Sequence, residues 1–327
     1  MVSKAVKRAG GFVVSLLVML ALGIVVLFIM LPQQRPAPEV NIDFSQERLA
    51  RGEYLFNNVL GCPVCHSERD WSKAGAPPMP PIGGGRECLE QGARPTGLGG
   101  NSGFPGRICF RNISSDPEAG VGAWSDGELW RAIREGIGRH DQALFPIMPY
   151  FIYNSLSNND TKAVITYLRT LAPVNRALPE TEITFPTSLF IRFLPRPVYE
   201  EVPDPDQLNT VRYGAYLARV ARCEFCHSPR NNRNRLPEEG LEFSGGVEFQ
   251  GNNGLFMSTN LTPHETGLGD MSRTEFIALF RNREGAMEGN VDIMPWSYFS
   301  GMTDDDLGAI YDFLQSLPSL STADKDI

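Results

Sequence analysis

Two segments of the chain place apolar residues on one face of a helix, and they match each other position by position. Apolar side chains recur at i, i+1, i+4 and i+8, which is typical of an amphipathic helix rather than of a strand. Equivalent positions lie 146 residues apart, as Asp160 and Asp306 do. They are Asp160, Ala163, Val164, Tyr167, Leu168 and Leu171 in the first segment and Asp306, Ala309, Ile310, Phe313, Leu314 and Leu317 in the second. We therefore predict two copies of one closing helix.

Start and stop signals flank both of these helices. Ser157 with Asp160, and Thr303 with Asp306, have the spacing of capping boxes in which Asp stands in place of Glu. A proline follows each helix as a stop signal. These prolines are Pro173 and Pro318.

Two further helices are predicted at Ser125–Glu135 and Ser272–Arg283, where GVGAWSDGEL (120–129) matches GLGDMSRTEF (267–276). We find no sustained alternation of apolar and polar residues that would indicate strands. The fold class predicted is therefore all-α, with two tandem domains of the same design. Because the helices are short and the loops rich in Gly and Pro, each domain is expected to wrap around a bound group that completes its apolar centre.

An apolar run occupies the N-terminal part of the chain. From Gly11 to Leu31, 21 residues carry no charge, which is long enough for a helix to cross a bilayer. Three cations precede the run, so we expect the N-terminus to face the cytoplasm and the remainder to lie in the periplasm. A cleaved signal peptide is the alternative, but its apolar region is usually shorter and ends at small residues. The bulky end of this run and the following Pro32 favour an uncleaved, single-pass anchor in the inner membrane.

Four parts are predicted along the chain. Residues 1–35 form a cytoplasmic tip, a transmembrane anchor and a tether, and residues 36–177 form the first domain. Residues 178–206 form a connector that is extended because of its many prolines. Residues 207–327 form the second domain. The connector also holds apolar residues that we expect to pack across both halves. They are Phe185, Leu189, Phe190, Ile191, Phe193 and Leu194.

Each half contains one Cys-x-x-Cys-His run, which is the attachment signature of haem c. The two thiols form thioethers with the haem vinyl groups, and the adjacent His supplies a ligand to the iron. The runs consist of Cys62, Cys65 and His66 and of Cys223, Cys226 and His227. A thioredoxin-like dithiol would need a βαβ context, which the pattern lacks. A zinc site would need two more ligands in each half, and the chain has only 4 His.

A second iron ligand is predicted from a repeated Met-Pro. Met148 and Met294 both precede Pro and both lie just ahead of a closing helix. Most Met residues only pack in a core, but repetition at equivalent places favours ligation. Met79 also precedes Pro without having a counterpart, and Met287 lies among Gly and Glu residues. Near the predicted haems, Asn112 and Asn260 are candidates for hydrogen bonds at a haem edge, and Arg134 and Arg281 for pairing with propionates, with ordinary solvated arginines as the alternative.

Cysteine count and charge add two further expectations. Cys88 and Cys109 remain after the motifs, and an even remainder in an oxidising compartment predicts a disulfide between them. The net charge is −8, and setting aside the three cations before the apolar run leaves −11 for the rest. An acidic soluble part argues against nucleic acid as a partner and favours cationic proteins.

Taken together, the motifs resemble class I cytochrome c domains repeated twice, and most closely the cytochrome c subunits of bacterial membrane-bound alcohol, aldehyde and gluconate dehydrogenases. The resemblance is carried by N-[IL]-[ST], G-x-G-x-x-[ST]-x-x-E-[LF], MP-[YW] and D-x-x-A-[IV]-x-x-[YF]-L, and it covers roughly residues 45–320. It implies two covalently attached haem c groups in two cytochrome c-like domains. It also implies a donor dehydrogenase or quinol-oxidising complex and an acceptor cytochrome or oxidase.

The function predicted is that of a membrane-anchored dihaem cytochrome c that relays electrons at the periplasmic face. We expect an electron-transfer protein or subunit rather than a catalytic chain. A dihaem peroxidase-type enzyme is the alternative, which would need a displaceable iron ligand and a nearby acid or base. The presence of a Met-Pro in both halves disfavours that alternative.

Overall fold

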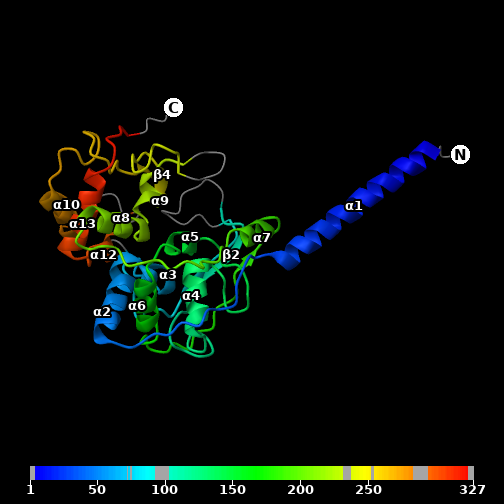
Figure 1. Ribbon diagram of the computed structural model, residues 1–327, viewed down its shortest axis with the longest axis horizontal. Coiled ribbons are helices and arrows are strands. Elements are labelled where there is room, and N and C mark those ends of the chain that lie inside the picture. Colours follow the sequence, from blue (N-terminus) through cyan, green and yellow to red (C-terminus); the bar gives the residue numbers. More distant parts are fainter. Residues whose placement is uncertain are drawn as a thin grey trace.

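The computed structural model describes residues 4–71, 73, 76–92, 103–230, 237–251, 254–282 and 294–322. Figure 1 shows one long helix, α1 (Lys4–Met30), that projects away from a body containing all other elements. A search of the described residues yields no helix with the length and hydropathy of a membrane span, so the predicted span at Gly11–Leu31 has no support from the structure.

Each half of the body is built from the same series of helices. The first half contains α2 (Gln46–Tyr54), which continues into the π-helical turn η1 (Leu55–Val59), then α3 (Cys62–His66), α4 (Asp126–Glu135), α5 (Tyr150–Tyr153) and α6 (Asn158–Leu168). The second half contains α8 (Thr210–Val220), α9 (Cys223–His227), α10 (Arg273–Arg281), α12 (Trp296–Phe299) and α13 (Asp304–Gln315). Both closing helices, α6 and α13, are found where the apolar pattern predicted them, and so are α4 and α10.

The expectation of a purely helical fold is wrong in detail, because five short strands occur among the described residues. β1 (Arg86–Leu89), β2 (Gly106–Phe110) and β3 (Glu182–Ile183) form one antiparallel sheet. β4 (Glu248–Gly251) and β5 (Gly254–Met257) form a second one. These strands are too short to show a period of two in the sequence, and β3 pairs with a strand far away along the chain. A disulfide joins Cys88 in β1 to Cys109 in β2, as the cysteine count predicted.

Glycines allow two helix crossings that organise the halves. α2 packs on α6, and a Cβ at Gly52 would lie 2.0 Å from the carbonyl oxygen of Ala163. In the second half α8 packs on α13, where a Cβ at Gly214 would lie 1.8 Å from the carbonyl oxygen of Ala309. Only a residue without a side chain allows the two backbones to approach this closely.

Gly52→Ala is therefore expected to destabilise the protein by about 2 kcal/mol, because overpacking costs about 1–3 kcal/mol and outweighs the better helix propensity of Ala. Urea unfolding of the variant and the parent measures the difference in the free energy of unfolding. Ala50→Ser is a matched control, since Ala50 is exposed on the same helix and should change stability by less than about 0.5 kcal/mol. A Gly52→Ala protein as stable as the parent would contradict the crossing.

The two halves meet through a reciprocal pair of tyrosine–aspartate hydrogen bonds. Tyr54 of α2 donates to Oδ2 of Asp306 at 2.6 Å, and Tyr216 of α8 donates to Oδ2 of Asp160 at 2.6 Å. Each tyrosine therefore reaches the first turn of the closing helix in the other half. Arg51 adds a bidentate contact to Asp160 at 2.8 and 2.9 Å. In a capping box, each Asp side chain would accept from the backbone N–H of its own N-cap residue. In the structure, each Asp instead accepts from a tyrosine of the other half.

The connector does not hold the halves together as predicted. It forms β3, the short helix α7 (Thr187–Phe190) and the 3₁₀ turn η2 (Ile191–Phe193). Ile191 is buried, but Phe185 and Phe190 are 71% and 62% exposed, so most of the apolar residues do not pack across the halves. The direct contacts between the halves make such packing unnecessary.

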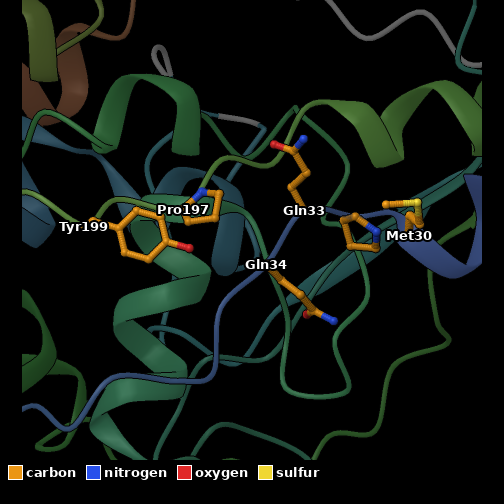
Figure 2. A pocket seen from close by; sticks show the side chains of 6 residues that line it. Met30, Gln33, Gln34, Pro197 and Tyr199 are labelled. Carbon is orange, nitrogen blue, oxygen red and sulfur yellow. The ribbon is translucent and has the colours of Figure 1, made fainter.

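The predicted tether lies against the body rather than apart from it. Arg35 forms an ion pair with the buried Glu135 of α4 at 2.6 Å, and Arg196 of the connector donates to Oε1 of Gln33 at 2.8 Å. A pocket at this place is lined by residues of both segments, and Figure 2 shows Gln33 and Gln34 beside Pro197 and Tyr199. The pocket belongs to the junction of tether and connector, since no motif residue lines it.

Candidate cofactor-binding sites

Both Cys-x-x-Cys-His runs form a single turn of helix, α3 and α9. Each turn begins after a residue in the left-handed conformation, with φ of 62° at Gly61 and 67° at Arg222. Residues three apart in a helix lie on the same face, so both thiols of each run are directed to one side. All four motif cysteines are free and partly exposed. This arrangement can present two sulfurs and the following imidazole to one planar group.

The imidazole of each run is oriented by a backbone carbonyl. Nδ1 of His66 lies 2.7 Å from the carbonyl oxygen of Arg111, and Nδ1 of His227 lies 2.7 Å from that of Thr259. A carbonyl only accepts, so Nδ1 carries the hydrogen and donates, which leaves the Nε2 lone pair free for a metal. Burial lowers the pKa of both histidines, so both rings are neutral, as iron ligands must be.

The loops after the two runs are fixed by matching hydrogen bonds. Ser67 accepts from the backbone N–H of Gly83 at 2.9 Å, and Ser228 accepts from that of Phe243 at 2.9 Å. The carbonyl of each motif histidine accepts from a glycine N–H at 2.8 Å. The serine that follows each histidine was not singled out from the sequence, although its repetition after both runs is a signal that could have found it.

Asn112 and Asn260 brace the ends of the two halves. Each Nδ2 donates at 2.7 Å to a carbonyl beyond the closing helix, that of Val174 in the first half and that of Leu320 in the second. Each Oδ1 also accepts from the backbone two residues on. The structure therefore gives both asparagines backbone partners, and their predicted hydrogen bonds at a haem edge stay a prediction.

The two Met-Pro sequences lie in equivalent turns. Met148 and Met294 are partly buried and pack against the apolar cluster that also contacts Cys62 and Cys223. The carbonyl of each Met accepts from the residue two positions later, at 2.9 and 2.8 Å. Of the alternative ligands, Met79 is 39% exposed and Met287 lies outside the described residues.

Arg134 and Arg281 support the segments that follow these turns. Arg134 donates to the carbonyl of Asn154 and to the side chain of Asn158. Arg281 donates to the carbonyls of Ser300 and Met302. Both arginines thus have protein partners at the end of the short helix after each Met-Pro. Nε of Arg134 is buried without a hydrogen-bond partner among the described residues, and pairing with a propionate stays a prediction.

The residues present fit a haem on two independent observations. First, each run places two thiols and an imidazole that is oriented through Nδ1 on one helical turn. Second, some buried polar atoms close to the Met-Pro turns have no hydrogen-bond partner among the described residues. They include the hydroxyl of Tyr150 and the hydroxyl of Ser297. Such orphaned atoms are expected where a polar edge of a ligand completes the site.

Comparison with known proteins points in the same direction. No protein-family model matches the chain. It is 29% identical over 233 residues to the cytochrome c subunit of a quinone-dependent alcohol dehydrogenase from Gluconacetobacter polyoxogenes, which covers 65% of this chain and 48% of the relative. It is 28% identical to the gluconate 2-dehydrogenase cytochrome c subunit of Pantoea cypripedii over 82% of this chain and 59% of the relative. It is 26% identical to a diheme cytochrome c-type protein of Cereibacter sphaeroides over 83% of this chain and 86% of the relative.

The chain is a relative of c-type cytochromes. The matches to the gluconate 2-dehydrogenase subunit and the diheme protein extend over 288 and 278 residues, more than either half could supply, so they include both halves. The chain spans about half the length of the dehydrogenase cytochrome subunits that it matches. These relatives support a cytochrome role in electron transfer for the chain.

Proposed function

We propose that this protein is a dihaem c-type cytochrome that passes single electrons between redox proteins. The observation that carries the proposal is the duplicated histidine geometry, in which Nδ1 donates to a carbonyl at 2.7 Å and Nε2 is left free beside two thiols. In this proposal Cys62, Cys65 and His66 hold one haem and Cys223, Cys226 and His227 hold the other. Met148 and Met294 complete the two ligand sets.

A haem c held in this way supplies an iron that alternates between ferrous and ferric states. The chain's contribution is to hold the group from both sides, with an imidazole oriented by its carbonyl and a thioether on a turn stiffened by Pro149 or Pro295. If His66 with Met148, and His227 with Met294, hold the two irons as proposed, peroxide would have to displace a side chain to bind. The same arrangement in both halves therefore favours electron transfer over a peroxidase-type enzyme.

We propose a dehydrogenase or another respiratory complex as the partner. Relatives of this chain are the cytochrome subunits of alcohol, gluconate and fructose dehydrogenases, which supports a donor of that kind. The part of the chain after the apolar run carries a charge of −11 (the total of −8 without three cations), which suits a basic docking surface on a donor or acceptor.

Counting the haem groups tests the proposal directly. The protein expressed in a host that attaches haem c should contain two haems per chain, measured as the pyridine haemochrome against the protein concentration. Both should remain bound through a denaturing gel, because thioether bonds survive unfolding. A protein without covalently bound haem would refute the proposal, and one haem per chain would refute its dihaem form.

Met148→Ala and Met294→Ala are each expected to open one iron to external ligands. The ferrous variant should bind carbon monoxide at about one site per chain, whereas the parent should bind almost none. Met79→Ala serves as the control, since Met79 is partly exposed and has no counterpart in the second half. If Met148→Ala and Met294→Ala bind no more carbon monoxide than the parent, the two methionines are not the ligands.

We also propose that the N-terminal apolar run attaches the protein to the inner membrane, with the haem domains in the periplasm. The support is the uncharged stretch from Gly11 to Leu31 and the three cations before it. Extraction of membranes with alkaline carbonate should leave the full chain in the pellet, and a chain that lacks residues 1–31, exported by a cleavable signal, should be soluble. A full chain released by carbonate would contradict attachment of this kind.

A further inference from the structure

A single arginine lies between the two motifs. Arg222 immediately precedes Cys223, and its Nη2 donates at 3.2 Å to the carbonyl of Leu60, two residues before Cys62. The same nitrogen lies 3.0 Å from the hydroxyl of Tyr298, and Tyr153 donates to the same Leu60 carbonyl at 3.1 Å. A side chain from the second motif therefore reaches the backbone that leads into the first motif.

The guanidinium of Arg222 extends from the residue directly before Cys223 to the backbone before Cys62, so its charge lies close to both runs. Both hydrogen-bond partners of Arg222 are neutral oxygens. None of the ion pairs between described residues includes Arg222. The cation is thus placed near both motifs, and no carboxylate of the described residues lies within ion-pair distance of it.

The backbone conformation at Arg222 indicates that its side chain has a function. Its φ of 67° lies in the left-handed region, and the equivalent residue in the first half is Gly61 with φ of 62°. Glycine is the residue that adopts this conformation without strain. At Gly61 a Cβ would lie 2.7 to 2.9 Å from ring atoms of Tyr298, so that position has no room for a side chain. The second half instead retains a long charged residue at a backbone position that favours glycine, which is the kind of outlier that indicates a function.

We propose that Arg222 is a fixed cation shared by the two cofactor sites and that its charge raises the reduction potentials of both haems. The proposal rests on the proposed dihaem function and adds to it a residue that contacts neither iron. A partly buried positive charge disfavours the additional positive charge of ferric iron, and its field is less screened than that of a charge at the surface. Arginine is suited to this role because its guanidinium stays charged over the whole working pH range.

Two variants separate the charge from the backbone. Arg222→Gly removes the cation while matching the residue found in the other half, so the backbone is relieved of strain. Arg222→Lys keeps a cation at the same position. Arg51→Gln is the matched control, because Arg51 lies at the same interface but is paired with Asp160. All three are compared with the parent by spectroelectrochemical titration, on protein in which two covalent haems have first been counted.

In Arg222→Gly the equilibrium constant for reduction should fall at least tenfold at each haem, which is about 59 mV for a one-electron couple. Arg222→Lys should recover most of this loss. Arg51→Gln should leave the equilibrium constant for reduction of each haem within threefold of the parent value, although it weakens the interface. Unchanged potentials in Arg222→Gly, or a shift at one haem only, would overturn the shared role. Since the haems are counted beforehand, such a result leaves the proposed function intact, whereas missing haem would count against the function itself.

Discussion

Replacing Cys62 and Cys65 together with alanine should leave a protein that carries one covalent haem instead of two. Both thiols lie on one turn of α3 beside His66, and without them no thioether can form in the first half. The haem of the second half should remain, because α9 supplies its own two thiols and its own histidine. The ratio of pyridine haemochrome to protein should therefore fall to half of the parent value.

The first half should also lose much of its stability in this variant. Its helices are short, and Cys62 and Met148 contribute to the apolar cluster that a haem would complete. A group that binds only the folded state stabilises that state by mass action, and a covalent group cannot dissociate. We expect thermal unfolding followed by circular dichroism to show an earlier transition for part of the helical signal.

Two control variants make the haem count specific. Alanine at both Cys223 and Cys226 should remove the other haem and leave the first. Alanine at both Cys88 and Cys109 should keep both haems, because these residues form a disulfide between β1 and β2 rather than part of a motif. Two haems in the Cys62/Cys65 variant would show that these thiols are not the attachment points.

Asp160→Ala is expected to destabilise the protein by about 3–5 kcal/mol, because it leaves a partly buried cation without its partner. Asp160 is only 6% exposed and accepts from Arg51 through both oxygens and from the hydroxyl of Tyr216 at 2.6 Å. Removing the carboxylate strips Arg51 of its ion pair and Tyr216 of its acceptor at the same time. Chemical unfolding measures the loss, and small-angle scattering shows whether the two halves separate.

A weak surface pair provides the control for this prediction. Arg273 and Asp312 lie 3.7 Å apart with side chains that are 45% and 30% exposed, so Asp312→Ala should cost no more than about 1 kcal/mol. The double variant Arg51→Met and Asp160→Ala should lose less stability than the sum of its single changes, since no unpaired charge remains. If Asp160→Ala is as stable as Asp312→Ala, the reciprocal contacts do not hold the halves together.

The local elements could be predicted well because their signals lie within a few residues of one another. Apolar periodicity located α6 and α13, and the side chains of Ser157 and Thr303 accept the cap hydrogen bonds as expected. The two Cys-x-x-Cys-His runs each form one turn of helix, α3 and α9. The strands were missed, because β3 has only two residues and gains its structure by pairing with β2.

Contacts between distant residues could not be predicted in this way. Asp160 and Asp306 fit a capping pattern, yet their carboxylates bind tyrosines of the opposite half. The connector has an apolar composition that suggests packing, yet Phe185, Phe190 and Leu194 are exposed. The carbonyls of Arg111 and Thr259 that orient the two histidines lie 45 and 32 positions away along the chain.

From its sequence alone this protein can be assigned a duplicated helical design, two haem-attachment runs and a pair of equivalent Met-Pro turns, because each depends on spacing within one or two helical turns. Only the tertiary structure shows that the two motifs approach one another, that Arg222 lies between them, and that each histidine is oriented by a remote carbonyl. Those features depend on how α2 and α8 cross the closing helices. They also depend on the hydrogen bonds that Tyr54 and Tyr216 donate to aspartates of the opposite half. Such choices are made by long-range packing, for which a local pattern carries no signal.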